Sequence, residues 1–196
     1  MRCRIHAFEP RSRSNGPGLR SVVWLQGCTL GCPGCFNPAS HARSGGWEAD
    51  TQEIVAEILR ASRSDQGIEG VTFSGGEPLE QPEAVLEIVQ GLETAGLGFL
   101  LFTGFTVREL VLRPLAIDVL CRLDAVIAGR YVAARRVGRA LLGSTNQELL
   151  FISRRYAPAD FSRVPIAEWI LRDGGSVSGT GIGGSTPLAA RLAASR

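Results

Sequence analysis

Short apolar segments separated by polar, glycine-rich turns run through most of the chain. A continuous apolar run at residues 22–25 is typical of a strand buried on both faces of a parallel sheet, and the largely apolar segments 71–73, 98–102 and 124–128 are predicted as further strands. Between these runs, apolar side chains recur every three to four residues, as in helices that bury one face. This alternation predicts βαβ units and an α/β fold, and right-handed crossovers would curl such a sheet toward a partial barrel.

Capping signals indicate where the helices begin. Asp50 and Thr106 are each followed three residues later by Glu, which is the capping-box pattern of a helix N-terminus. Pro82 suits the first turn of another helix. Pro114 is expected to break the helix that begins after Thr106, or to restart it before residues 117–123, because proline lacks the N–H that a helix interior needs.

The pattern loosens in the last third of the chain. We expect a strand at 149–152 and then a closing hairpin, whose tight turn is the segment Asp173-Gly174-Gly175. Residues 183–196 are rich in Gly, Ser and Ala and are predicted to form a flexible tail. The chain is therefore expected to be one domain at 1–182, a partial parallel β/α barrel with a C-terminal β-hairpin extension.

Length and charge exclude several classes of function. A chain of 196 residues can bury a sizeable core, and its formal net charge of +2 is too balanced for an electrostatic nucleic-acid binder. No stretch approaches the length of a membrane span, and the N-terminus lacks the apolar segment of a secretory signal. We therefore expect a cytoplasmic protein with no membrane or nucleic-acid partner, in which cysteines serve as metal or redox groups rather than disulfides.

A cysteine loop follows the apolar run at 22–25. Cys28, Cys32 and Cys35 lie within eight residues, and thiolates are the preferred ligands of iron–sulfur clusters and zinc. A four-iron cluster held by three cysteines keeps one iron free for a ligand. The alternative is a closed zinc site, in which His41 would supply the fourth ligand.

A second candidate loop, Ser74-Gly75-Gly76-Glu77-Pro78, follows the run at 71–73. Paired glycines let a ligand approach the backbone, and the carboxylate can accept hydrogen bonds from an ammonium group. The alternative is an ordinary strand-to-helix turn with a solvated Glu. Since both loops follow the C-terminal ends of predicted strands, we expect them to face each other across one cavity.

Taken together, these motifs resemble the radical S-adenosylmethionine (SAM) superfamily. The chain looks most similar to the small activating enzymes of glycyl-radical proteins, above all those of anaerobic ribonucleotide reductase. In the commoner superfamily motif an aromatic residue precedes the third cysteine, whereas here Gly34 precedes it and Phe36 follows it. The resemblance rests on the cysteine and Gly-Gly-Glu loops and on the segments Asn15-Gly16-Pro17-Gly18-Leu19-Arg20, Phe102-Thr103-Gly104-Phe105-Thr106 and Gly143-Ser144-Thr145-Asn146-Gln147.

The resemblance implies a mechanism and a set of site residues. Cys28, Cys32 and Cys35 would hold a [4Fe-4S] cluster, whose fourth iron SAM would chelate. Reduction would cleave SAM to methionine and a 5′-deoxyadenosyl radical, which abstracts a hydrogen atom. The residues expected to bind SAM are Phe36, Asn37, Ser74, Gly75, Gly76, Glu77, Thr103 and Gly104.

The source of that hydrogen atom stays open at this point. By resemblance it would be a glycine of a glycyl-radical enzyme, with flavodoxin or ferredoxin as electron donor. Alternatively, the same chemistry would epimerise a small molecule such as a sugar or oligosaccharide, and Cys3 or Cys121 would then be candidate hydrogen-atom donors. A zinc-bound structural module is disfavoured, because it leaves the Gly-Gly-Glu loop unexplained.

Overall fold

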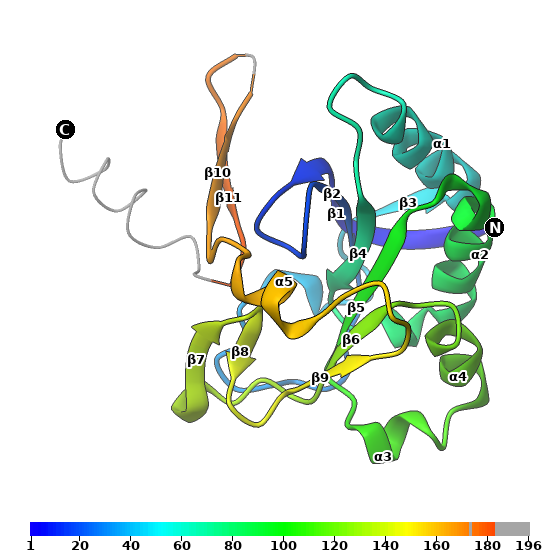
Figure 1. The fold of residues 1–196 in the computed structure, drawn as a ribbon. Coiled ribbons are helices and arrows are strands. Elements are labelled where there is room, and N and C mark those ends of the chain that lie inside the picture. The colour runs from blue at the N-terminus through cyan, green and yellow to red at the C-terminus, as the bar shows by residue number, and fades with distance from the viewer. Residues whose placement is uncertain (173, 183–196) are drawn as a thin grey trace, which may run out of the picture.

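A seven-stranded sheet forms the centre of the computed structural model, which describes residues 1–172 and 174–182 (Figure 1). The strand order is β3-β1-β2-β4-β5-β6-β9. β2, β4, β5 and β6 are parallel to one another, whereas β1, β3 and β9 join in antiparallel pairs. The predicted α/β fold with a largely parallel central sheet is confirmed, and its flanking strands are antiparallel. The strands are β1 (Arg2–Ser12), β2 (Arg20–Leu25), β3 (Trp47–Asp50), β4 (Gly70–Gly75), β5 (Gly98–Thr103), β6 (Ala125–Ala128) and β9 (Glu148–Phe151).

The helices begin where the capping signals indicate. Asp50 and Thr106 both form capping boxes, and Pro82 and Pro114 each open a helix. Figure 1 shows α1, α2 and α4 along one side of the sheet. The helices are α1 (Thr51–Ser62), α2 (Pro82–Leu92), α3 (Val107–Leu110), α4 (Pro114–Leu120) and α5 (Pro158–Ser162).

Two hairpins lie on the other side of the sheet (Figure 1). The first is formed by β7 (Arg136–Arg139) and β8 (Leu142–Ser144), and the second by β10 (Glu168–Leu171) and β11 (Val177–Thr180). Asp173 of the expected tight turn and the expected tail at 183–196 lie outside the described residues. The sequence pattern did not predict β3, β7, β8 or α5.

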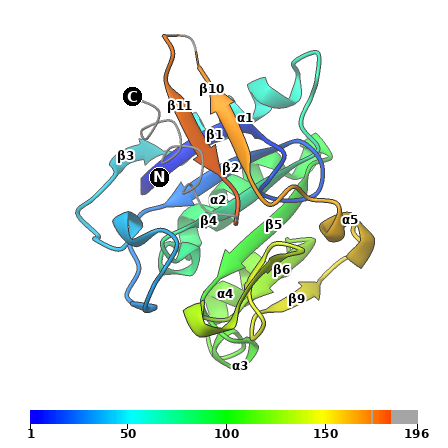
Figure 2. The ribbon, with the colours of Figure 1, turned by 90° about the vertical axis from the view of Figure 1, so that its left-hand side faces the viewer.

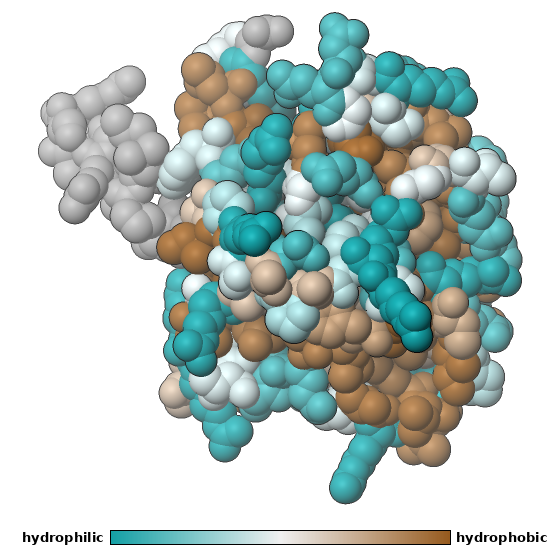
Figure 3. Space-filling view, viewed as in Figure 1, coloured by the Kyte–Doolittle hydropathy of each residue, from teal (hydrophilic) through white to brown (hydrophobic). Residues whose placement is uncertain are grey.

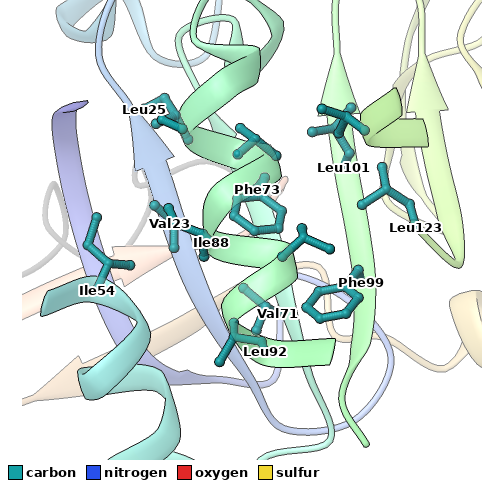
Figure 4. Packing of buried hydrophobic residues seen from close by; sticks show 14 of the residues in the cluster. Val23, Leu25, Ile54, Val71, Phe73, Ile88, Leu92, Phe99, Leu101 and Leu123 are labelled. Carbon is teal, nitrogen blue, oxygen red and sulfur yellow. The ribbon is translucent and has the colours of Figure 1, made fainter. Parts of the chain in front are cut away.

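The parallel strands use their two faces differently. Side chains such as Val23, Phe73 and Leu101 are fully buried in the main core, and Figure 4 shows them packed toward α2. This burial is the dominant favourable contribution to folding. Since side chains alternate between faces, their neighbours point the other way. At the C-terminal ends of the strands these neighbours line a cavity, and they are Trp24, Ser74 and Phe102.

Arg20 closes the space between the N-terminal ends of the parallel strands. Its guanidinium is fully buried and donates to the carbonyls of Pro17, Val71 and Gly98 and to the hydroxyls of Thr72 and Tyr156, at 2.8 to 3.0 Å. Burial lowers the pKa of Arg20, and these oxygens compensate for lost hydration. The space between the parallel strands is therefore filled by Arg20 at their N-terminal ends and is open at their C-terminal ends.

Membrane-spanning length is not reached by any helix within residues 1–172 and 174–182.

Candidate active site

A cavity of about 700 Å³ lies at the C-terminal ends of the parallel strands. Ligand sites of α/β sheets gather at this end because the loops that follow the strands meet there. Its walls bring together all three cysteines of the loop and all eight residues expected to bind SAM. The members of that predicted set that line it are Cys28, Cys32, Cys35, Phe36, Asn37, Ser74, Gly75, Gly76, Glu77, Thr103 and Gly104.

Main-chain hydrogen bonds fix the start of the cysteine loop. The N–H of Gly27 donates to the carbonyl of Ser40 at 2.8 Å, and that of Cys28 donates to the carbonyl of His41 at 3.0 Å. The Gln26 side chain adds a bond to the carbonyl of Ala42 at 2.6 Å. The loop therefore leaves β2 with its first cysteine held in place, and His41 contributes through its backbone.

Glu80 holds the middle of the cysteine loop, and the sequence pattern did not single it out. Its carboxylate accepts from the Thr29 N–H at 2.7 Å and from the Arg43 guanidinium at 3.1 Å. Partial burial alone would raise the pKa of Glu80, but the bonds from Thr29 and Arg43 outweigh it and hold the pKa below its ordinary value. The only feature of the sequence that could have pointed to Glu80 is its position three residues after Glu77 of the Gly-Gly-Glu loop.

The base of the Gly-Gly-Glu loop contacts the residues that lead into the cysteine loop. Gly76 donates to the carbonyl of Leu25, and Glu77 donates its N–H to the carbonyl of Gly27, both at 2.8 Å. A Cβ on Gly76 would stand 2.2 Å from the Gly27 carbonyl oxygen, so this close approach requires glycine. The expectation that both loops line one cavity is confirmed, and because β2 and β4 are neighbouring strands the two loops are hydrogen-bonded at their bases.

Glu77 is 1% exposed and ties this loop to the end of β5. One carboxylate oxygen accepts from the Leu79 N–H and the Thr103 hydroxyl at 3.0 and 2.8 Å, and the other accepts from the Gly104 N–H at 2.7 Å. Burial raises its pKa to about 7, although these hydrogen bonds act in the opposite direction. Glu77 is therefore buried rather than solvated, and its carboxylate already has hydrogen-bond partners within the protein.

An aromatic wall follows the third cysteine. The rings of Phe36 and Tyr131 lie 4.3 Å apart between centroids, and the guanidinium of Arg136 lies 5.1 Å from the Phe36 centroid. A Cβ on Gly143 would come within 2.7 Å of the Phe36 ring, so β8 also packs closely against it. Tyr131 and Arg136, which line the cavity as well, were not predicted as site residues.

The two remaining cysteines are not part of the described cavity lining. Cys3 is 4% exposed in the core, and burial raises the pKa of its thiol to about 11. Cys121 follows α4 at the surface. The structure therefore does not bring the two candidate hydrogen-atom donors to the cysteine loop.

Comparison with known proteins identifies the family. Residues 14–150 match the family described as a 4Fe-4S single cluster domain. The anaerobic ribonucleoside-triphosphate reductase-activating protein of Vibrio cholerae is 32% identical over 72% of this chain and 94% of its own length. The chain belongs to the radical SAM family of activating enzymes.

Other members of the radical SAM activating family are longer than their match to this chain. The pyruvate formate-lyase-activating enzyme of Clostridium pasteurianum is 40% identical over 49% of this chain and 44% of its own length. That of Listeria monocytogenes is 36% identical over 47% of this chain and 38% of its own length. The chain thus spans less than half of these relatives, and all three relatives named here are activating enzymes rather than epimerases.

The cavity fits the [4Fe-4S] cluster and SAM that this family implies. Each thiolate of a cubane binds a different iron, so three thiols around an open cavity leave one iron for a ligand. The Asn37 N–H donates to the Cys35 sulfur at 3.4 Å, a type of contact that tunes such clusters. The match to a 4Fe-4S single cluster domain assigns an iron–sulfur cluster to these cysteines in place of the closed zinc site with His41.

Proposed function

We propose that this chain activates a glycyl-radical enzyme by removing a hydrogen atom from one of its glycines. The observation that carries the proposal is that the three-cysteine loop and the Gly-Gly-Glu loop line one cavity in direct contact. When bound, the reduced cluster and SAM supply a 5′-deoxyadenosyl radical, which abstracts the hydrogen atom. The protein supplies orientation and keeps water from the reacting centre.

The proposed roles of the chain's residues follow from their places on the cavity wall. Cys28, Cys32 and Cys35 hold the cluster. The main chain at Gly75 and Gly76, which carries no side chain, would contact the amino group of SAM. The Glu77 carboxylate would support this contact. The other residues proposed to contact SAM are Phe36, Asn37, Ser74, Thr103 and Gly104.

The wider organisation is also part of the proposal. The order β2-β4-β5-β6, with helices on one side, supports a partial β/α barrel that the hairpin β10–β11 extends. We place the working domain at residues 1–182 and the tail after it. The electron donor would be a flavodoxin or a ferredoxin, and the compartment the cytoplasm.

Cluster binding and SAM cleavage test the chemistry. Anaerobic reconstitution should give about four irons per chain, and reduction with SAM should release 5′-deoxyadenosine. Cys32→Ser should abolish both, whereas Cys121→Ser should retain both, because Cys121 lies at the surface outside the described cavity lining. One zinc per chain and no 5′-deoxyadenosine would contradict the proposal.

Hydrogen abstraction from a partner tests the substrate. The relatives' names direct the choice of partner to an anaerobic ribonucleoside-triphosphate reductase or a pyruvate formate-lyase from the same organism. With the partner's glycines deuterated at Cα, we expect a glycyl EPR signal on the partner and deuterium in 5′-deoxyadenosine. SAM cleavage that transfers no deuterium from either partner would refute activation of these two enzymes while leaving the radical chemistry intact.

A further inference from the structure

The hairpin β10–β11 lies beyond the matched residues 14–150, yet it lines the cavity that holds the cysteine loop. In β10 and the residue after it, every second residue lines the cavity, and these residues are Ile170 and Arg172. From β11 and the residues after it, five consecutive residues contribute. These are Ser178, Gly179, Thr180, Gly181 and Ile182. A strand that presents consecutive residues to a cavity presents its main chain there, because side chains alone would alternate.

Gly179, the glycine of β11, gives a second indication that this strand presents its main chain to the cavity. A Cβ built on Gly179 would point at the Trp169 ring, 3.0 Å away, so what Gly179 offers the cavity is backbone. The large apolar side chains, Trp169, Leu171 and Val177, are exposed on the hairpin's surface. Figure 3 shows hydrophobic surface over this hairpin.

The register shows which backbone groups are unpaired. Within the described residues, β11 pairs with β10 alone. The Arg172 N–H donates to the Ser176 carbonyl at 2.9 Å, and the pairing continues with Leu171 opposite Val177 and Trp169 opposite Gly179. In an antiparallel pair, hydrogen-bonded and non-hydrogen-bonded residue pairs alternate. Counting from Arg172, Gly179 lies in a non-hydrogen-bonded pair, so its N–H and C=O point away from β10.

Polar contacts join the hairpin to β1 and to the residues that follow it (Figure 1 and Figure 2). Glu168 accepts from the Ser12 hydroxyl at 2.7 Å and from the Arg13 N–H at 2.8 Å, and Asn15 donates to the Thr180 hydroxyl at 2.8 Å. Farther along the hairpin, Arg172 forms an ion pair with Glu9, whose side chain is 9% exposed. The hairpin is therefore anchored both at its base and near its turn.

We propose that the free edge of β11 at Gly179 binds an extended, glycine-bearing main-chain segment of the partner protein and lays it along the cavity. Strand addition of this kind takes affinity from main-chain hydrogen bonds, and a glycine edge lets the added strand approach closely. The inference rests on the proposed function, because it assigns a polypeptide rather than a small molecule to this cavity. It gives the segment after residue 150 a role in holding the substrate.

Gly179→Pro and Gly179→Ala form a matched pair of variants. Both add a Cβ against Trp169, which is 37% exposed and has room to shift. The Pro variant alone removes the outward N–H, and proline is tolerated where a strand's N–H faces a free edge. The probe is a fluorescein-labelled pool of nine-residue peptides with a central glycine, titrated into reconstituted enzyme with SAM and followed by fluorescence anisotropy.

We expect Gly179→Pro to bind the pool roughly tenfold more weakly than Gly179→Ala, the loss that a main-chain hydrogen bond or two would produce. A pool N-methylated beside its glycine should bind the unsubstituted enzyme more weakly by a similar factor. Cys121→Ser, at the surface outside the described cavity lining, is the control and should match the unsubstituted enzyme in peptide affinity and in peptide-free release of 5′-deoxyadenosine. Equal affinities of the two variants, or no discrimination against N-methylated peptides, would overturn the inference. Absence of SAM cleavage would instead refute the proposed function, and would leave the peptide preference as evidence for the binding edge.

Discussion

Glu80 stabilises the cysteine loop from outside it, through Thr29 and Arg43. Glu80→Ala should therefore loosen the loop without removing a cluster ligand. Outer partners of metal ligands commonly change metal affinity by roughly tenfold or more, so we expect roughly tenfold faster loss of iron to a chelator. The measurement is iron release after anaerobic reconstitution. Glu83→Ala, an exposed change in the next helix, is the control, and equal release rates in the two variants would contradict this role.

Replacement of Arg20 should cost stability, because its buried guanidinium donates to several buried oxygens. Arg20→Met leaves the carbonyls of Val71 and Gly98 without their donor in the interior. We expect a loss of about 2–5 kcal/mol in the free energy of unfolding, because each buried carbonyl left without a donor costs about 1–3 kcal/mol. Urea denaturation measures it, with Arg60→Met at an exposed position as the control. A loss similar to the control's would show that the buried guanidinium contributes little.

Single residues also show what the sequence could and could not predict. The spacing of Cys28, Cys32 and Cys35 predicts a metal centre, since thiolates at this spacing reach one cluster from a single loop. Glu77 was expected to be solvated or to meet a ligand, and its bonds to Thr103 and Gly104 depend on where β5 ends relative to β4. Such contacts join segments far apart in the chain, so no local pattern reveals them.

At the scale of elements, a bidentate ion pair joins α3 to the segment that follows β6. Arg130 donates to both carboxylate oxygens of Glu109 at 2.7 and 2.8 Å, and the hydrogen bond from Arg130 is the main reason that the pKa of Glu109 falls to about 2. A carboxyl whose pKa is lower in the folded state than its ordinary 4.5 stabilises the fold above that value. Its contribution is then lost as the pH falls from 4.5 toward 2.

We therefore expect Glu109→Gln to be less stable than the unsubstituted protein at pH 7, with the difference shrinking below pH 4.5. Both side chains are more than a third exposed, so solvent screening limits the difference to about 1 kcal/mol or less. Thermal unfolding between pH 7 and pH 3 measures it. In an Arg130→Gln background the same change should have little further effect. A difference that does not vary with pH would exclude the ion pair as its source.

The elements differ in how far local sequence determines them. Helix starts at Asp50, Pro82, Thr106 and Pro114 were predicted because caps and prolines act within one turn. The sequence did not predict that β1 pairs antiparallel with β2, or that β9 pairs antiparallel with β6. An apolar run does not encode the direction of the strand beside it. β7 has no buried residue and β8 is only three residues long, so neither shows a periodic apolar pattern, and β8 packs against the ring of Phe36.

At the scale of the whole molecule, the part of the chain matched to the family does not complete the fold. The face of β5 and β6 opposite α2 carries Leu100 and Ile127, which pack in a second core cluster with Phe161 of α5. Phe161 is fully buried, but it lies eleven positions beyond the match that ends at residue 150. Residues after the match are therefore needed to close the interior below the cavity.

Two truncations test this division of the chain. A chain ending at Ile182 keeps Phe161 and all the described cavity residues, so its unfolding midpoint and SAM cleavage should match those of the full chain. A chain ending at Ser153 loses Phe161 and Tyr156 as well as the hairpin, and removal of one large buried aromatic already costs about 3–5 kcal/mol. We expect the shorter chain to be unfolded or to melt far below the full chain in circular dichroism. If a chain ending at Ser153 were stable and bound the iron–sulfur cluster, the matched segment would fold alone. The hydrophobic packing around Phe161 would then not be required for the domain to fold.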